Sequence, residues 1–205
     1  KKRKVSNYAH ISDPKEIGGL LRMIDQYKGT YQVGTALKIA PYVFLRPLEL
    51  AGLKWSEVDF KDRLIRIDAE RMKMGETHLV PLSNQVIKLL ENIKNIETGS
   101  IYIFPSPTTS KRHISPESLR AGLRRMGLSN DEMTTHGFRH MASTRLYELG
   151  FNGDVIERQL AHGERNKIKA TYNHAQHLDK RRIMMNEWAN YLDKLRDNQI
   201  LEQVK

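Results

Sequence analysis

The chain has 205 residues, of which 39% are hydrophobic and 28% charged, an ordinary composition for a globular domain. It contains no cysteine, which excludes disulfide scaffolds, thiolate nucleophiles and cysteine-ligated zinc. No apolar run approaches the roughly 20 residues of a membrane helix, and no apolar region follows the basic N-terminus as it would in a signal peptide. We therefore expect an intracellular protein that is not embedded in a membrane.

The charge of the chain points to a polyanionic partner. Lysine and arginine total 34 against 24 acidic residues, which gives a formal net charge of +10 and a pI near 9.7. Four of the positive charges lie in the first five residues, and the others include the pairs Lys111-Arg112, Arg124-Arg125 and Arg181-Arg182. Neutralising phosphates with such residues releases condensed counterions, which favours nucleic acid as the partner. A basic surface that serves only solubility is the alternative.

The predicted elements define a mainly helical α+β fold. Residues 1–10 are basic and without periodicity, and we expect them to be the remnant of a linker, with the folded domain over 11–205. Apolar spacing, Asp and Ser caps, Pro at helix starts and Gly at helix ends predict helices over 14–27, 31–45, 47–52, 84–97, 116–127, 135–149, 154–161, 166–174 and 178–197. Alternation and turn signals predict a small three-stranded antiparallel sheet over 56–60, 64–69 and 78–82.

The last predicted helix, 178–197, has an apolar stripe. Its members follow helical spacing: Leu178, Met185, Trp188, Leu192 and Leu195. Such a stripe is a packing face. Packing on its own domain and docking on a neighbouring protomer are both open alternatives.

Arg46 is the first candidate functional residue. It lies between Phe44-Leu45 and Pro47-Leu48, and Glu49 follows three residues later. A guanidinium is costly to bury unless it is paired, and Glu49 supplies a partner. The planar fork of donors also suits a phosphate. A purely structural ion pair is the alternative.

The second candidate cluster is the segment 136–140, His-Gly-Phe-Arg-His. His136 and Arg139 are three residues apart and project from one face at the start of a predicted helix, where anions are favoured. His136 and His140 have a spacing that also suits a metal ion. However, no Glu lies between them as in a zinc protease, and no cysteine assists, so we expect no metal.

Two further residues are weak signals when taken alone. His162 precedes Gly163, and histidines in that position most often only end a helix. Tyr172 follows ten residues later, and a tyrosine near a helix end is most often simply packed.

Together these residues carry a resemblance to a known family. Arg46 with Glu49, a lysine in a hairpin, His136 with Arg139, His162 and then Tyr172 resemble, in this order, the catalytic signature of the tyrosine recombinases, the phage integrase family. The chain resembles most closely the integrases of prophages and genomic islands. The matching segments are 46–50 (RPLEL), 73–83 (KMGETHLVPLS), 160–162 (LAH) and 172–175 (YNHA), followed by Arg181-Arg182 and Trp188.

The resemblance spans about Asp13 to Leu195 and has one clear departure. Many family members carry Thr-Gly shortly before the first arginine, where this chain has Val43-Phe44. We expect this difference to affect the local backbone more than the chemistry.

The resemblance implies cleavage and rejoining of DNA through a covalent 3′-phosphotyrosine, without a metal or other cofactor. Arg46 and Arg139 would clamp the non-bridging phosphate oxygens, and His162 would add a hydrogen bond. Tyr172 would be the nucleophile. A free phenol has a pKa near 10, so the tyrosine must lose its proton during the attack.

The remaining roles concern protons and support. His136 is the expected base for the proton of the tyrosine, and Lys73 the expected acid for the 5′ oxygen. Arg71 lies two residues before Lys73, but Lys73 fits the role better because it lies at the turn between the second and third predicted strands. Glu49 and His140 would support the site.

The resemblance also implies partners and a setting. The partner would be double-stranded DNA carrying attachment sites, and the location the cytoplasm of a bacterium, with no membrane association. DNA-binding domains N-terminal to this one would be absent from the chain. The full-length protein would act as a homotetramer on DNA, and this fragment alone would be a monomer. If 178–197 docks on a neighbour, deletion of 178–205 should weaken recombination more than the fold.

Two alternative functions stay open. A type IB topoisomerase uses similar chemistry to relax supercoils without exchanging partners. A DNA-binding module that has lost catalysis would also explain the positive charge, but it would not cleave DNA.

Overall fold

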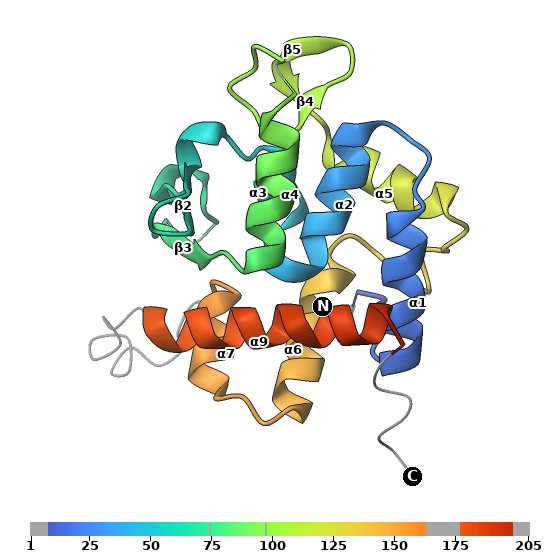
Figure 1. Ribbon diagram of the computed structural model, residues 1–205, viewed down its shortest axis with the longest axis vertical. Coiled ribbons are helices and arrows are strands. Elements are labelled where there is room, and N and C mark those ends of the chain that lie inside the picture. Colours follow the sequence, from blue (N-terminus) through green and yellow to red (C-terminus); the bar gives the residue numbers. More distant parts are fainter. Residues whose placement is uncertain (1–7, 74, 97, 163–176, 199–205) are drawn as a thin grey trace, which may run out of the picture.

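The computed structural model describes residues 8–73, 75–96, 98–162 and 177–198 (Figure 1). The helices described are α1 (Pro14–Asp25), α2 (Tyr31–Val43), α3 (Pro47–Ala51), α4 (Asn84–Lys94), α5 (Pro116–Arg125), α6 (Gly137–Glu148), α7 (Gly153–Gln159) and α9 (Leu178–Arg196). The strands are β1 (Val58–Asp59), β2 (Leu64–Ile67), β3 (His78–Pro81), β4 (Pro105–Ser106) and β5 (Thr109–His113), and two 3-10 helices are η1 (Trp55–Glu57) and η2 (Ala69–Arg71).

The predicted fold class is confirmed. The first three strands form an antiparallel sheet in the order β1-β2-β3, in which Ile65 pairs with Val58 on one side and with Val80 on the other. The first strand is shorter than predicted, because the Glu57 carboxylate accepts a hydrogen bond from the Lys54 N–H (2.8 Å) and closes a 3-10 turn there. The helix predicted over 166–174 lies outside the described residues.

A second, two-stranded sheet was not predicted. Strands β4 and β5 form a hairpin that projects from the body of the molecule at the top of Figure 1. Residues 105–113 are mostly polar and lack apolar alternation, so the sequence has no strand signal here. The Ser100 hydroxyl donates to the carbonyl of Ser110 (2.7 Å) and ties the hairpin to the preceding loop.

The predicted helix starts agree with the observed caps, with one exception. The side chains of Asp13, Ser83 and Ser115 each accept a hydrogen bond from the N–H three residues later. Helix α6 instead begins at Gly137, two residues after the predicted start. There the Thr134 hydroxyl accepts a hydrogen bond from the Gly137 N–H (2.9 Å).

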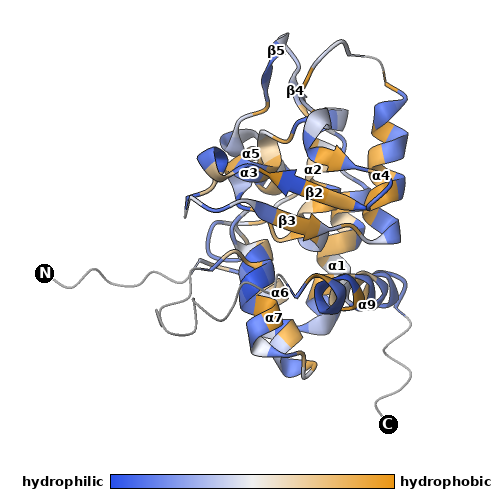
Figure 2. Cartoon of the chain, turned by 90° about the vertical axis from the view of Figure 1, so that its left-hand side faces the viewer, coloured by the Kyte–Doolittle hydropathy of each residue, from blue (hydrophilic) through white to orange (hydrophobic). Residues whose placement is uncertain are grey.

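Helix α2 lies at the centre of the molecule. It packs against α1, α4, α5, α6 and α9, and its residues Ala36, Leu37 and Ile39 are fully buried. The hydropathy colouring shows many apolar residues along α2, α4 and β2 (Figure 2), and Leu90 of α4 and Ile65 of β2 are fully buried. None of the described helices combines the length and apolar character needed to cross a lipid bilayer.

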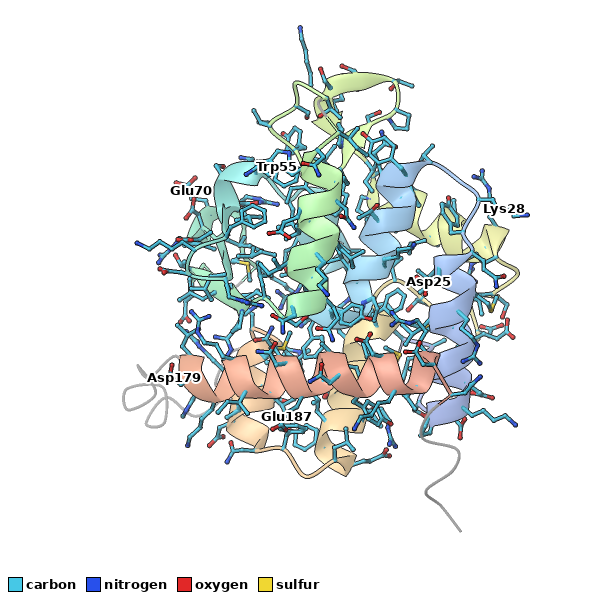
Figure 3. All side chains as sticks on the ribbon, in the orientation of Figure 1. Asp25, Lys28, Trp55, Glu70, Asp179 and Glu187 are labelled. Carbon is cyan, nitrogen blue, oxygen red and sulfur yellow. The ribbon has the colours of Figure 1, made fainter. Side chains whose placement is uncertain are left out.

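Helix α9 is part of the core of its own domain. Trp188 is fully buried, its indole N–H donates to the carbonyl of Pro41 (2.8 Å), and its ring meets Phe44 edge-on with centroids 5.9 Å apart. The C-terminal end of the helix packs across α1, and the labelled residues Asp179 and Glu187 are on its exposed side (Figure 3). Of the two alternatives for the apolar stripe, packing within the same chain is therefore the one observed.

This packing corrects the expectation for a truncation at residue 178. Met184, Met185, Trp188 and Leu192 are each at most 1% exposed. At about 1.5–3 kcal/mol for each large apolar side chain, their loss would be comparable with the whole stability of a domain. Deletion of 178–205 should therefore unfold the protein.

Candidate active site

The C-terminal end of α7 provides two free carbonyl groups. Ala161 has the left-handed φ of 49°, and the N–H groups of Ala161 and His162 return to the carbonyls of Arg158 (3.2 Å) and Glu157 (3.1 Å). This is the Schellman arrangement, which turns the chain sharply at a helix end. The carbonyls of Leu160 and Ala161 remain free to accept hydrogen bonds from side chains.

Arg139, on the first turn of α6, connects this helix end to another. Its Nη2 donates to the carbonyl of Leu160 (2.6 Å), and its Nη1 donates to the carbonyl of Phe44. Phe44 has the left-handed φ of 58° and ends α2. Arg139 is 3% exposed, so its guanidinium is fixed between the ends of α2 and α7.

Arg46 reaches the same place from the start of α3. Glu49 accepts from the Arg46 backbone N–H with Oε2 (2.9 Å) and from Nη1 with Oε1 (2.7 Å), so the ion pair expected from the sequence is present. Nη2 of Arg46 donates to the carbonyl of Ala161 (3.4 Å). The Glu49 side chain is 6% exposed but that of Arg46 is 20% exposed, which leaves part of the guanidinium accessible.

His162 completes this group at the end of α7. Its Nε2 lies 3.4 Å from Nη2 of Arg139. Arg46, Arg139 and His162 come from three different segments of the chain, and the tertiary structure brings them together.

The two guanidiniums leave positive charge uncompensated. Burial, followed by the neighbouring Arg46, lowers the pKa of Arg139 to about 10. Within the described part of the chain, one carboxylate, that of Glu49, hydrogen-bonds to Arg46, and none hydrogen-bonds to Arg139. The Nε of Arg139 is buried and has no hydrogen-bond partner among the described residues. An anion at this point would therefore relieve an unfavourable charge.

His136 is an uncharged histidine beside these arginines. It lies at the start of α6, and burial followed by Arg139 lowers its pKa to about 4. The imidazole is therefore uncharged at pH 7. The His140 ring lies 5.4 Å from the His136 ring, and its pKa is also lowered, first by burial and then by His10. In the residues that the structure covers, no three His, Cys, Asp or Glu side chains are placed to hold a metal ion.

Part of the segment assigned to the linker packs against this site. The Tyr8 ring lies 4.3 Å from the His136 ring, and the carbonyl of Ala9 accepts a hydrogen bond from the Thr134 N–H (3.2 Å). Residues 8–10, assigned to the linker from the sequence, thus contact the folded domain.

Of the two remaining predicted site residues, Lys73 is among the described residues and Tyr172 is not. Lys73 is exposed in the loop between η2 and β3 and makes no hydrogen bond or ion pair with another described residue. Arg71, the alternative to it, pairs with Glu57 and donates to the carbonyl of Glu49 (3.5 Å). Tyr172 lies outside the described residues.

Sequence reasoning missed a buried polar network behind the site. Gln159 is fully buried, and its amide donates to the carbonyl of Val43 (3.4 Å) while its Oε1 accepts from Nε of Arg181 (2.9 Å). Arg181 also donates to the carbonyl of Leu79 on β3. The sequence has little signal for this network, because Arg181 lies between Lys180 and Arg182 and its partners are distant along the chain.

Sequence comparison decides the family. The family model described as "Phage integrase family" matches residues 12–178. The chain belongs to the phage integrase family. Its relatives include the integrase of Enterobacteria phage P4, which is 39% identical over 195 residues, covering 88% of this chain and 44% of the relative. The prophage integrase IntS of Escherichia coli K12 is 37% identical over 179 residues, covering 87% of this chain and 46% of the relative. The chain thus spans less than half the length of these integrases.

Solved structures show that this integrase-family chain has the fold of tyrosine recombinase catalytic domains. The integrase of mycobacterium phage Brujita superposes with a TM-score of 0.65 at 17% identity, covering 95% of this chain and 65% of the other. The Tn1549 transposon integrase, solved in complex with circular intermediate DNA, superposes with a TM-score of 0.61 at 17% identity, covering 90% of this chain and 67% of the other.

Proposed function

We propose that this chain is the catalytic part of a site-specific DNA recombinase, which cleaves and rejoins strands of double-stranded DNA through a 3′-phosphotyrosine. The observation that carries the proposal is the pair of guanidiniums, Arg46 and Arg139, held beside His162 with one carboxylate, Glu49, hydrogen-bonded to Arg46. The structure of the Tn1549 integrase with DNA, named above, supports DNA as the partner.

Charge neutralisation is the first requirement of the reaction. A phosphodiester carries a negative charge that repels a nucleophile, and forked donors on its non-bridging oxygens remove that repulsion. Arg46 has an accessible guanidinium face, and Arg139 is immobilised by two carbonyls. Donors held in this way would need little reorganisation when charge develops in the transition state.

Proton transfer accompanies the attack. The Tyr172 oxygen forms a bond to phosphorus as its proton passes to the neutral His136, and the bond from phosphorus to the 5′ oxygen breaks. Lys73 protonates that leaving oxygen. A 5′ hydroxyl from another strand reverses the step, which rejoins the DNA without an external energy source. Glu49 holds Arg46 in position throughout.

The biological setting is also part of the proposal. The recombinase would integrate or excise a mobile element at attachment sites in the bacterial cytoplasm. Further DNA-binding domains would belong to the longer protein, which would act as a homotetramer on DNA, and the present fragment would be monomeric without DNA.

Covalent capture tests the chemistry. The protein is incubated with supercoiled plasmid and with duplexes that contain a nick next to the cleavage site, and the reaction is quenched with detergent. The matched control is Tyr31→Phe, which removes the hydroxyl of an exposed tyrosine at the start of α2. We expect a detergent-stable protein–DNA adduct with the parent and with Tyr31→Phe, and none with Tyr172→Phe.

The competing functions give other results. Adduct formation in Tyr172→Phe would overturn the assignment of the nucleophile. Relaxation of plasmid without strand exchange between two attachment sites, even in the full-length protein, would indicate a type IB topoisomerase. DNA binding without an adduct in the full-length protein would indicate a binding module.

A further inference from the structure

Glu157 forms a side-chain pair with His162 across the turn that ends α7. Nδ1 of His162 lies 2.7 Å from Oε2 of Glu157, and the His162 N–H is bonded to the Glu157 carbonyl (3.1 Å). Backbone and side chain of His162 are therefore both held by the same residue. The two side chains are 44% and 48% exposed, so this pair is not part of the apolar core.

The partners of the imidazole define its tautomer. An ionised carboxylate only accepts hydrogen bonds, so Nδ1 must carry a hydrogen. A guanidinium only donates, so Nε2, which faces Nη2 of Arg139 at 3.4 Å, must present its lone pair. Both contacts thus specify the same neutral form, with the hydrogen on Nδ1.

A second helix holds Glu157 in place. The hydroxyl of Tyr147, on α6, donates to the other carboxylate oxygen of Glu157 (3.1 Å). Burial and then the Glu157 carboxylate raise the pKa of Tyr147, so this hydroxyl keeps its hydrogen at neutral pH. The chain of contacts runs from Tyr147 through Glu157 and His162 to Arg139, and it begins and ends on α6.

We propose that Glu157 is a positioning residue for the recombinase reaction, because it fixes the ring orientation and tautomer of His162 so that Nε2 faces the phosphate site. This inference rests on the proposed function. To donate to a phosphate oxygen, Nε2 must gain a proton, and the carboxylate of Glu157 then faces the resulting positive charge on the ring. Among the described residues, the other charged or titratable groups near the ring include Arg139, Arg46, His136 and His140.

The first test is independent of DNA. Nitrogen-15 NMR of the whole chain, with the His162 signals assigned from the spectrum of His162→Gln, reports which ring nitrogen carries the hydrogen at pH 8. We expect the Nδ1–H form in the parent protein. In Glu157→Gln the amide can donate to Nδ1, and the balance should move toward the Nε2–H form. An Nε2–H ring in the parent, or an unchanged tautomer in Glu157→Gln, would overturn the proposal even if the protein proves to be a recombinase.

The second test measures cleavage of nicked duplexes. We expect Glu157→Gln to lower the cleavage rate about tenfold with little change in DNA affinity, because the charged His162 ring that donates to the phosphate loses its carboxylate partner. Tyr147→Phe leaves the carboxylate and should lower the rate only about twofold to threefold. The matched control is Glu148→Gln, which removes an exposed carboxylate paired with Arg145 on α6.

The outcomes separate the two proposals. Cleavage by Glu157→Gln at the parent rate, or an equal loss in Glu148→Gln, would remove the positioning role. If the full-length parent protein itself does not cleave, the proposed function fails, whereas the NMR result still decides the tautomer.

Discussion

Replacing Arg139 with methionine should separate the folding cost of this arginine from its functional use. Burial lowers its pKa to about 10, which at 1.36 kcal/mol per pKa unit corresponds to about 3 kcal/mol of unfavourable free energy for holding the charge in the folded protein. Methionine has a similar length and removes that cost. It also removes the donors to the carbonyls of Phe44 and Leu160. Leaving a buried carbonyl without a hydrogen bond costs about 1–3 kcal/mol of folding free energy for each carbonyl.

These opposing effects predict a stable but inactive variant. We expect the free energy of unfolding of Arg139→Met, measured with urea and followed by tryptophan fluorescence, to lie within about 2 kcal/mol of the parent value. Cleavage of nicked DNA should fall by about a thousandfold or more, because a fixed cation at the phosphate contributes at that level. Sulfate should raise the melting temperature of the parent more than that of the variant.

Two results would refute this reasoning. An Arg139→Met protein that is unfolded at 25 °C would show that the two carbonyl contacts are worth far more than the buried charge costs. A variant that cleaves within tenfold of the parent rate would show that the phosphate is held elsewhere.

Three further predictions concern stability. Burial lowers the pKa of His78 from 6.5 to about 3, so the unfolded chain takes up a proton below pH 6.5 that the folded chain refuses. Stability should therefore fall as the pH drops, by about 2 kcal/mol at pH 5 from this residue, and urea unfolding of His78→Leu should lack that part of the loss. Trp188→Ala should cost about 3–5 kcal/mol in urea unfolding, and a cost below 1 kcal/mol would contradict the role assigned to α9. Phe44→Gly relieves about 1 kcal/mol of left-handed strain but removes a buried ring, so calorimetry should show a net destabilisation of about 2–4 kcal/mol.

The family and the order of the elements could be predicted from the sequence because their signals are local. Caps such as those at Asp13 and Ser83 depend on residues three positions apart, and so does the ion pair between Arg46 and Glu49. The amphipathic spacing of the helices identifies the buried faces in the same way, since it repeats within each helix.

Other features required the tertiary structure because they depend on groups far apart in the chain. Arg139 is held by the carbonyls of Phe44 and Leu160, which become available only because two helices end in left-handed residues at the same place. The α9 stripe was compatible with either of two partners, and only the packing of Trp188 against α2 decides between them. The short β4–β5 hairpin is mostly polar, so no apolar alternation in the sequence predicted its strands.

For the candidate site, too, the residue types could be predicted from the sequence, whereas their geometry and charge could not. The sequence by itself determined which residue types are present, because Arg46, Arg139 and His162 match a family pattern. The tertiary structure decided how they are held and charged, because burial lowers the pKa values of Arg139 and His136 and a sharp turn brings Glu157 back onto His162. Desolvation and hydrogen-bond geometry depend on the three-dimensional surroundings of a group, which the spacing of residues along a chain does not specify.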